Sequence, residues 1–218
     1  MDIKLYHGSR TQGIVELKPN QSTQEGAYVY ATPSEVLATI FINRQGALLL
    51  QISEKDSKFI ICERKPGIIK QTSGIPGSVY EVDPTNFDYF TEHSWKNFEV
   101  RAKGTQKVLK EDRIPNLYER FQQYENQGLL DIYYYPKKLD YMAEDDSDLV
   151  QMAFQLYFIG NKCTDNLDHF KKHYPQFRGL TDRIYNKVKN YSNKDLESFV
   201  KNMYDKKEKK LNFDLIGE

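Results

Sequence analysis

The chain has 218 residues, of which 28% are charged and 39% hydrophobic, and its 31 basic and 31 acidic residues give a net charge of zero. This balance excludes a general electrostatic attraction to nucleic acid or to an anionic membrane. No apolar run approaches the length of a membrane span, and the mean hydropathy is −0.72. We therefore expect one large domain, or a domain with an appendage, without membrane or nucleic-acid partners.

The cysteine content and the N-terminus indicate a compartment. Cys62 and Cys163 are too few for a disulfide framework, and both are expected to be reduced. Residues 1–5 lack the apolar core of a signal peptide. A cytoplasmic location is therefore the expectation.

The first part of the chain predicts two strands and a helix. Residues 3–7 alternate in the manner of a strand, and residues 28–31 are aromatic and β-branched, as in a second strand. Thr32 fits the N-cap of a helix that has Pro33 at its first position and ends near Gly46. A strand that turns directly into a helix is expected here.

The middle of the chain predicts several strands and one helix. Strands are expected at residues 47–53, 58–64, 78–82, 97–102, 106–109 and 130–135. A helix is expected at residues 114–127. Because strands and helices do not alternate regularly, the expected class is α+β with a mixed or antiparallel sheet, and not a doubly wound parallel sheet.

The C-terminal part has a different character. Helices are expected at residues 145–159, 165–174, 181–191 and 192–206, with Ser192 as the cap of the last one. The basic run at residues 206–210 is expected to be a solvated helix end. We predict an α+β domain at residues 1–140 and a helical region at residues 141–218, which can also pack as part of the same domain.

Three groups of residues in the α+β part suit a nucleotide-binding site. His7-Gly8-Ser9 ends the first strand and combines polar side chains with a glycine that permits close backbone approach. Tyr28 and Tyr30 lie two apart on one strand, so their rings face the same side. Phe41, on the following helix, can form a second stacking wall.

These features resemble ADP-ribosyltransferases of the His-Tyr-Glu group. Leu5-Tyr6-His7-Gly8-Ser9 is similar to the first motif of that family, a strand that ends in His-Gly-Thr or His-Gly-Ser. Gly26 to Thr32, with the helix from Pro33 to Asn43, resembles the second motif, a glycine-led strand with a tyrosine that runs into a helix. Trp95 to Val100, followed by Gln106 to Leu109, resembles the third, a strand that carries a glutamate.

The resemblance implies the split β-sheet core of an ADP-ribosyltransferase-like domain, with NAD as the substrate. In this fold, His7 would bind the ribose hydroxyls, the backbone of Gly8 would hold the nicotinamide amide, and Ser9 would assist. Tyr30 would stack on the nicotinamide ring, with Tyr28 as the alternative in register.

The resemblance also implies a reaction. Glu99 would stabilise the positive charge that develops on the ribose as nicotinamide leaves, and Glu81 is the alternative carboxylate. The implied activity is transfer of ADP-ribose to an unknown acceptor, without a metal ion and with a protein acceptor or partner held by the helical region. Two alternatives stay open: a non-catalytic binding module, and an NAD-consuming RNA 2′-phosphotransferase, which would need several arginines such as Arg10, Arg44 and Arg64.

Overall fold

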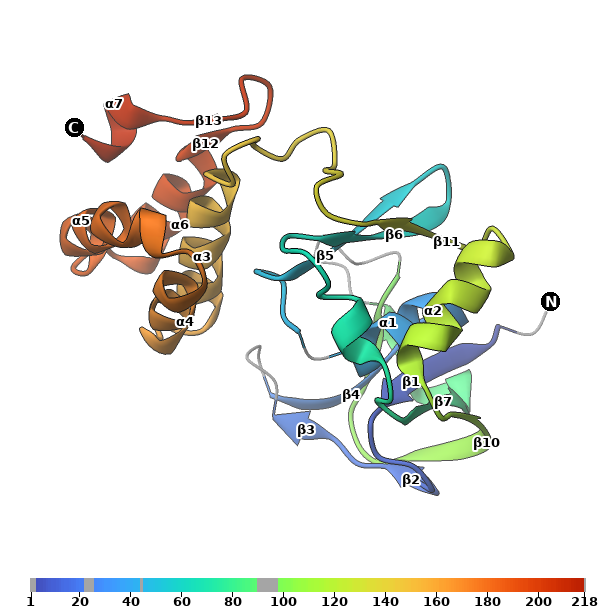
Figure 1. Ribbon diagram of the computed structural model, residues 1–218. Helices are drawn as coiled ribbons and strands as arrows, with labels where there is room; N and C mark the ends of the chain where they lie inside the picture. The colour runs from blue at the N-terminus through green and yellow to red at the C-terminus, as the bar shows by residue number, and fades with distance from the viewer. Residues whose placement is uncertain (1–2, 22–25, 44, 90–97, 218) are drawn as a thin grey trace. The chain divides into compact units, whose positions relative to one another are not determined.

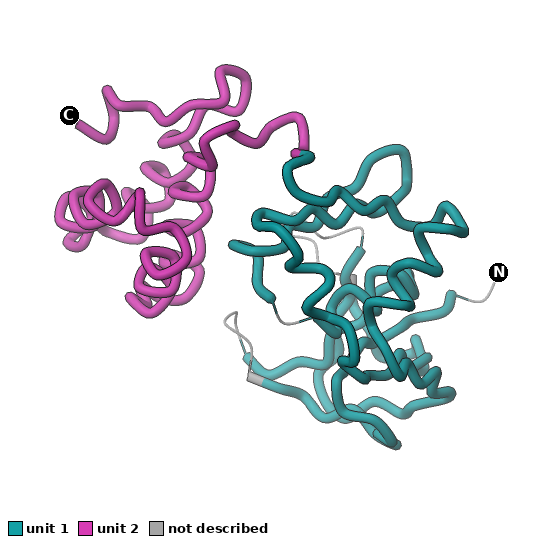
Figure 2. Tube along the Cα trace, viewed as in Figure 1, with its two compact units in different colours: residues 1–137 teal, residues 138–218 magenta. Residues whose placement is uncertain are grey.

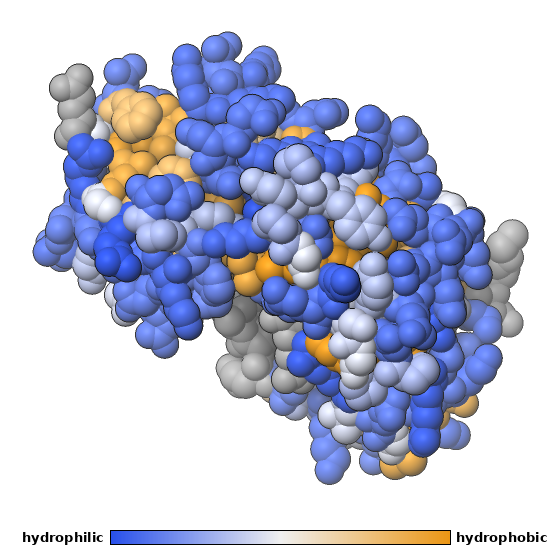
Figure 3. Space-filling view, in the orientation of Figure 1, coloured by the Kyte–Doolittle hydropathy of each residue, from blue (hydrophilic) through white to orange (hydrophobic). Residues whose placement is uncertain are grey.

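The computed structural model describes residues 3–21, 26–43, 45–89 and 98–217. They form two compact units, unit 1 at residues 1–137 and unit 2 at residues 138–218, where the expected boundary lay at residue 140 (Figure 1, Figure 2). The face drawn in Figure 3 is mostly hydrophilic, with scattered apolar patches. In the described ranges, no helix is both long enough and apolar enough to cross a membrane.

Two four-stranded antiparallel sheets share one core in unit 1. Their strand orders are β1-β7-β10-β2 and β3-β4-β9-β8. The strands are β1 (Leu5–Ser9), β2 (Glu16–Leu17), β3 (Asn20–Gln21), β4 (Ala27–Ala31), β7 (Gly77–Val82), β8 (Asp88–Tyr89), β9 (Val100–Ala102) and β10 (Gln106–Ile114). Both sheets contribute side chains to the core, namely Leu5, Leu17, Val29, Ala31, Tyr80, Val82 and Val100. The expectation of an α+β protein with largely antiparallel sheets is confirmed at this level.

A third sheet and two helices complete unit 1. In the third sheet, of order β11-β6-β5, the β11–β6 pair is parallel and the β6–β5 pair antiparallel. The elements are α1 (Glu35–Ile42), β5 (Leu50–Lys55), β6 (Lys58–Glu63), α2 (Leu117–Asn126) and β11 (Leu130–Tyr133), with 3-10 turns at Lys70–Thr72 and Pro84–Asn86. Helix α1 packs on β1 and β7.

Helix α1 begins later than the sequence predicts, and the prediction of Thr32 as its N-cap is wrong. Ser34 is the cap, and its Oγ accepts a hydrogen bond from the backbone N–H of Leu37 at 3.2 Å. Thr32 instead exchanges backbone hydrogen bonds with Tyr6, at 2.8 and 2.9 Å. The pairing of Thr32 with Tyr6 of β1 takes precedence over capping. It therefore fixes the point at which the chain ends β4 and turns toward α1.

Strand β10 is also longer than expected, and the prediction that a helix begins at Ile114 is wrong. Ile114 is the last residue of β10 and pairs with Gly77 of β7. Pro115 disfavours the helical conformation of the residue before it, so Ile114 stays extended. Helix α2 starts only after Asn116, whose Oδ1 accepts a hydrogen bond from the N–H of Tyr118 at 3.2 Å.

Unit 2 consists of four principal helices followed by a short hairpin and a final helical turn. The elements are α3 (Asp148–Ile159), α4 (Asp165–His173), a 3-10 turn at Pro175–Phe177, α5 (Arg178–Val188), α6 (Asn193–Asn202), β12 (Tyr204–Asp205), β13 (Lys210–Leu211) and α7 (Phe213–Ile216). Ser192 caps α6 as predicted. The run at residues 206–210 is not a helix end, because it forms the turn of the β12–β13 hairpin and its last residue pairs with Asp205.

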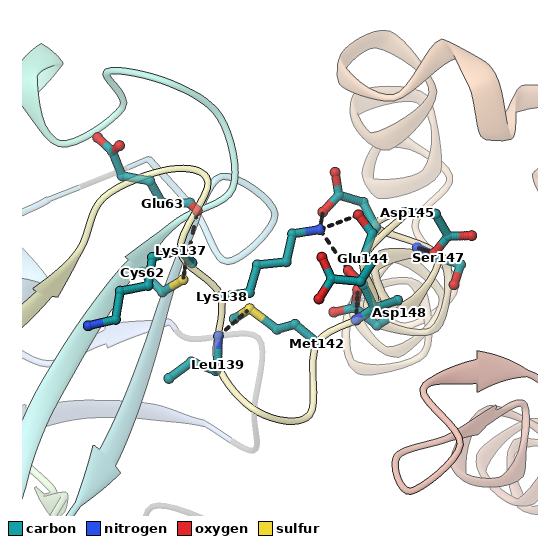
Figure 4. Close-up of polar contacts among 12 residues, drawn as sticks. Cys62, Glu63, Lys137, Lys138, Leu139, Met142, Glu144, Asp145, Ser147 and Asp148 are labelled. Atoms are coloured by element: carbon teal, nitrogen blue, oxygen red, sulfur yellow. Dashed lines mark hydrogen bonds and ion pairs between the residues drawn. The ribbon is translucent and has the colours of Figure 1, made fainter.

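One lysine orders the start of unit 2. The ammonium group of Lys138 donates to the carbonyl oxygens of Ala143 and Glu144, at 2.7 and 2.6 Å, and to a carboxylate oxygen of Asp146 at 3.0 Å (Figure 4). Its side chain is only 12% exposed. These three contacts hold the turn that leads into α3.

In unit 1, a carboxylate on β10 tethers the loop that follows β1. Glu111 Oε1 accepts hydrogen bonds from the backbone N–H of Gly13 at 2.8 Å, from the Ser78 hydroxyl at 2.7 Å and from the Tyr80 hydroxyl at 3.1 Å. Its Oε2 accepts one from Arg113 at 3.1 Å. These donors, the Gly13 N–H first, lower the pKa of Glu111 to about 2.

We expect the Glu111→Gln variant to unfold at a lower temperature than wild type at pH 7. The folded-state pKa is depressed, so the ionised carboxylate stabilises the fold above pH 4.5, and this contribution is lost as the pH falls toward about 2. The difference between variant and wild type, followed by thermal unfolding across this range, should therefore shrink with acidification. Glu16→Gln, an exposed change on β2, is the control, and equal pH profiles for wild type and Glu111→Gln would contradict the tether.

Candidate functional site

Five of the predicted site residues line one pocket of unit 1. The pocket has a volume of about 180 Å³. Its lining residues are Tyr6, His7, Gly8, Tyr30, Ala31, Thr32, Phe41 and Glu99. They come from β1, the end of β4, helix α1 and the position before β9.

The pocket arises where β1 and β4 diverge. Tyr6 and Thr32 form a hydrogen-bonded antiparallel pair, and no further bridge joins the two strands among the described residues. The next hydrogen-bonded pair of such a ladder would be Gly8 with Tyr30. The carbonyl of Tyr30 instead accepts a hydrogen bond from Nδ1 of His7 at 2.7 Å. The imidazole of His7 therefore makes the hydrogen bond to Tyr30 that the backbone of Gly8 would make in a continuous ladder.

The divergence directs the backbone of Gly8 toward the pocket. Tyr6 points its N–H and C=O at Thr32, away from β7. Because these groups alternate along a strand, the N–H and C=O of Gly8 point the same way. Gly8 thus presents one donor and one acceptor at the open strand edge, a pattern complementary to a carboxamide.

Gly8 is also required by helix packing. A Cβ atom at this position would lie 1.8 Å from the carbonyl oxygen of Ala38 and 2.8 Å from its carbonyl carbon. Both are backbone atoms of α1, which therefore lies against β1 more closely than any other residue would permit. The sequence suggested that this glycine serves the ligand, and the structure adds a second reason in the packing of α1.

His7 is held as a neutral hydrogen-bond acceptor. Since the carbonyl of Tyr30 can only accept, Nδ1 must carry the proton, and in the neutral ring Nε2 then has a lone pair. Burial lowers the pKa of His7, and the hydrogen bond to Tyr30 opposes this only in part. Nε2 can thus accept a hydrogen bond from a ligand hydroxyl.

Glu99 brings a carboxylate to the same pocket. It is partly buried, and within the described ranges it makes no hydrogen bond or ion pair. Burial raises its pKa above the ordinary value of 4.5. A carboxylate in this setting favours a positively charged or hydroxyl-bearing ligand group nearby.

Two aromatic residues line the pocket. Tyr30 lines it from β4, and Phe41 lines it from α1 while remaining 43% exposed. Tyr28 does not line the pocket. Its ring packs edge-on against Tyr30, with centroids 6.1 Å apart, and lies 4.5 Å from the guanidinium carbon of Arg101. Of the two predicted tyrosines, Tyr30 is therefore the one placed for stacking.

Two other predicted residues lie elsewhere. Ser9 is outside the pocket lining, and its Oγ accepts a hydrogen bond from the N–H of Thr11 at 3.1 Å. Glu81 borders a different groove, of about 190 Å³, where it forms an ion pair with Lys4 at 3.2 Å. It is next to Tyr80 in β7 and so points to the opposite face of the sheet. Residues 95–97 of the third motif lie outside the described residues.

Sequence reasoning missed some residues around the pocket. Tyr6 and Thr32 also line it, and Arg101 lies opposite the lining residue Tyr30 in the pairing of β4 with β9. Only the pairing of β1 with β4 could have identified the first two, because nothing in their residue types predicts it. In the described part of the chain, no three His, Cys, Asp or Glu side chains gather as metal ligands.

Comparisons of the chain with protein-family models, with curated proteins and with solved structures found no match.

Proposed function

We propose that the chain is an ADP-ribosyltransferase-like enzyme that binds NAD, cleaves its nicotinamide–ribose bond and transfers ADP-ribose to an acceptor. The observation that carries this proposal is Glu99, a carboxylate without a protein partner among the described residues, in the same pocket as the neutral acceptor His7 and the backbone edge of Gly8. The divided sheets of unit 1 are compatible with the fold that the sequence motifs suggest.

Each group has a role in holding the substrate. The N–H and C=O of Gly8 match the carboxamide of nicotinamide, and Nε2 of His7 matches a ribose hydroxyl. Tyr30 and Phe41 provide faces for a planar ring. The pyridinium ring of NAD is positively charged, so it also complements the carboxylate of Glu99.

Glu99 would act on the bond that breaks. As the bond between ribose C1′ and the pyridinium nitrogen cleaves, its electron pair goes to the ring nitrogen and positive charge develops on the ribose. A carboxylate beside that charge stabilises it, and the low water content of a partly buried site strengthens the effect. The acceptor nucleophile then bonds to C1′ and loses its proton, for which the carboxylate of Glu99 in the lining would be the base.

The two alternative functions have less support. A partly buried carboxylate without a partner among the described residues costs free energy in the folded state, and a reaction that develops positive charge beside it would offset this cost. An RNA 2′-phosphotransferase needs accessible arginines, yet Arg64 is only 1% exposed and Arg10 donates its Nε hydrogen bond to the carbonyl of Ile42 at 3.2 Å. Arg44 lies outside the described residues.

Calorimetry with NAD tests the proposal directly. We expect wild-type protein to bind NAD with a dissociation constant of about 1 µM to 1 mM. His7→Ala should weaken binding about tenfold, because one hydrogen bond to the ribose is lost. Chromatography should detect nicotinamide released by wild type. A wild type that binds neither NAD nor any fragment of it would rule the proposal out.

A further inference from the structure

An apolar patch of unit 2 lies over α5 and α7, where Figure 3 shows it as an orange area at the upper left. It borders a hollow with a volume of about 410 Å³. The apolar residues that line this hollow are Phe177, Leu180, Leu211 and Phe213. The Phe213 side chain is 52% exposed. An exposed phenylalanine beside an apolar hollow is typical of a surface that contacts another protein.

The exposure of Phe213 is a product of ordered structure. Phe213 is the first residue of α7, and the backbone N–H of Asn212 before it donates to the carbonyl oxygen of Met203 at 2.9 Å. At the other end of α7, the ammonium group of Lys187 donates to the carbonyl oxygen of Leu215 at 2.7 Å. Both ends of this helical turn are thus fixed to the rest of unit 2. The ring is therefore presented in a defined position, which lowers the entropy cost of a contact made through it.

Both signs of charge occur in the lining of the hollow. Glu144 and Asp145 come from the segment before α3, and Lys209 and Lys210 come from the turn and last strand of the hairpin. Lys210 pairs with Glu208 at 3.5 Å, and no ion pair joins the lysines to Glu144 or Asp145 within the described ranges. A surface with one sign of charge would repel a copy of itself. A surface with separate acidic and basic groups can instead pair with a copy in the opposite orientation.

We propose that this hollow is the contact surface of a symmetric dimer, and that its occupant is the Phe213 ring of a second copy of the chain. In a two-fold contact the same surface of each copy meets itself, so each Phe213 enters the hollow of the other copy. There it packs on Phe177 and Leu180. The acidic residues of one copy then face Lys209 of the other. This inference goes beyond the proposed function and concerns unit 2 alone.

The contact is small, and this sets the expected affinity. One hollow per copy places the interface at the low end of the range for specific complexes, at about 1,200 Å² or less. We therefore expect a dimer dissociation constant between about 1 and 100 µM. Sedimentation equilibrium of the full chain measures it. A wild type that stays monomeric up to about 300 µM would overturn the proposal.

Replacing Phe213 tests the apolar part of the contact. Phe213→Ser should raise the dissociation constant at least about tenfold, because the dimer loses both of its aromatic anchors. Ile159→Ser removes another exposed apolar side chain, which lines a different hollow between α3 and α6, and should change the constant less than about twofold. Equal dissociation constants for Phe213→Ser and wild type, or an equal loss in Ile159→Ser, would refute the assignment.

A charge exchange tests whether the occupant is a second copy. Glu144→Lys and Lys209→Glu should each raise the dissociation constant about three- to tenfold, because every dimer gains two like-charge contacts. An equimolar mixture of these two variants should associate with nearly wild-type affinity, because each introduced charge then faces one of opposite sign. Lys194→Glu, an exposed charge reversal on α6 outside the lining, is the control and should leave the constant unchanged. A mixture that associates no better than either variant alone would rule out the second copy as the occupant.

Discussion

Replacing Glu99 with glutamine is expected to slow NAD cleavage strongly and, at the same time, to make the protein more stable at pH 7. Glutamine keeps the shape of the side chain but cannot offer a negative charge to the ribose. The loss of such an electrostatic contact typically lowers kcat about 10²- to 10³-fold. Binding of NAD should change far less, because the contacts of His7 and Gly8 remain.

The gain in stability follows from the sign of the pKa shift. Burial raises the pKa of Glu99 above 4.5, so the ionised carboxylate is less favourable in the folded state than in the unfolded chain. This destabilisation is absent below pH 4.5 and grows as the pH rises through the folded-state pKa. The midpoint of thermal unfolding should therefore be higher for Glu99→Gln than for wild type at pH 7, and equal to it at low pH.

Two measurements on the same samples check both halves of this expectation. Nicotinamide release gives the turnover, and differential scanning calorimetry gives the unfolding midpoint. Glu54→Gln, an exposed and isosteric change on β5, should alter neither. A Glu99→Gln variant that turns over NAD normally would exclude Glu99 from the reaction, and a lowered midpoint at pH 7 would indicate a structural partner for the carboxylate.

Gly8→Ala should have the largest effect on stability. The added methyl group would lie 1.8 Å from the carbonyl oxygen of Ala38, and no side-chain rotation can relieve a contact with the backbone. Helix α1 would have to move away from β1, at a cost of about 3 kcal/mol or more. For a protein of this size, that corresponds to a decrease in Tm of about 6 to 12 °C.

A matched glycine provides the control for Gly8→Ala. Gly179, in α5, would place its Cβ in open space, so Gly179→Ala adds the same methyl group without a clash. It should leave stability unchanged or increase it by about 0.5 to 1 kcal/mol, because alanine is the better helix former. Both unfolding curves are measured without ligand. A Gly8→Ala protein as stable as wild type would mean that α1 does not pack on β1 as closely as the structure indicates.

The sequence predicts much of the site because its chemistry lies in short local motifs. Residue type and strand position point to His7 and to the pair Tyr28 and Tyr30, the resemblance to the family motifs points to Tyr30 and Glu99, and the structure places His7, Tyr30 and Glu99 on one pocket. The strand alternation that puts Tyr28 and Tyr30 on one face is also local. This alternation alone could not decide whether Tyr28 or Tyr30 lines the pocket, because the position of the pocket depends on where β1 lies beside β4.

Features that depend on pairing between distant strands could not be predicted. Thr32 and Ser34 are both good N-caps, and the hydrogen bonds of Thr32 to Tyr6 decide between them. A strand at residues 106–109 and a helix from residue 114 were expected, yet β10 continues to Ile114 because it pairs with β7. Competition between local propensity and long-range pairing explains each of these errors.

The divergence of β1 and β4 has a consequence for self-association. An open strand edge is ordinarily a hazard, because its unpaired N–H and C=O groups can template pairing with another chain. Here the open edge at the pocket amounts to Gly8 alone, between the Tyr6–Thr32 pair and the end of β1 at Ser9. One residue is too short to nucleate a strand, and the ring of Phe41 borders the same space. The protein can therefore offer backbone hydrogen bonds to a small molecule without offering them to a second polypeptide.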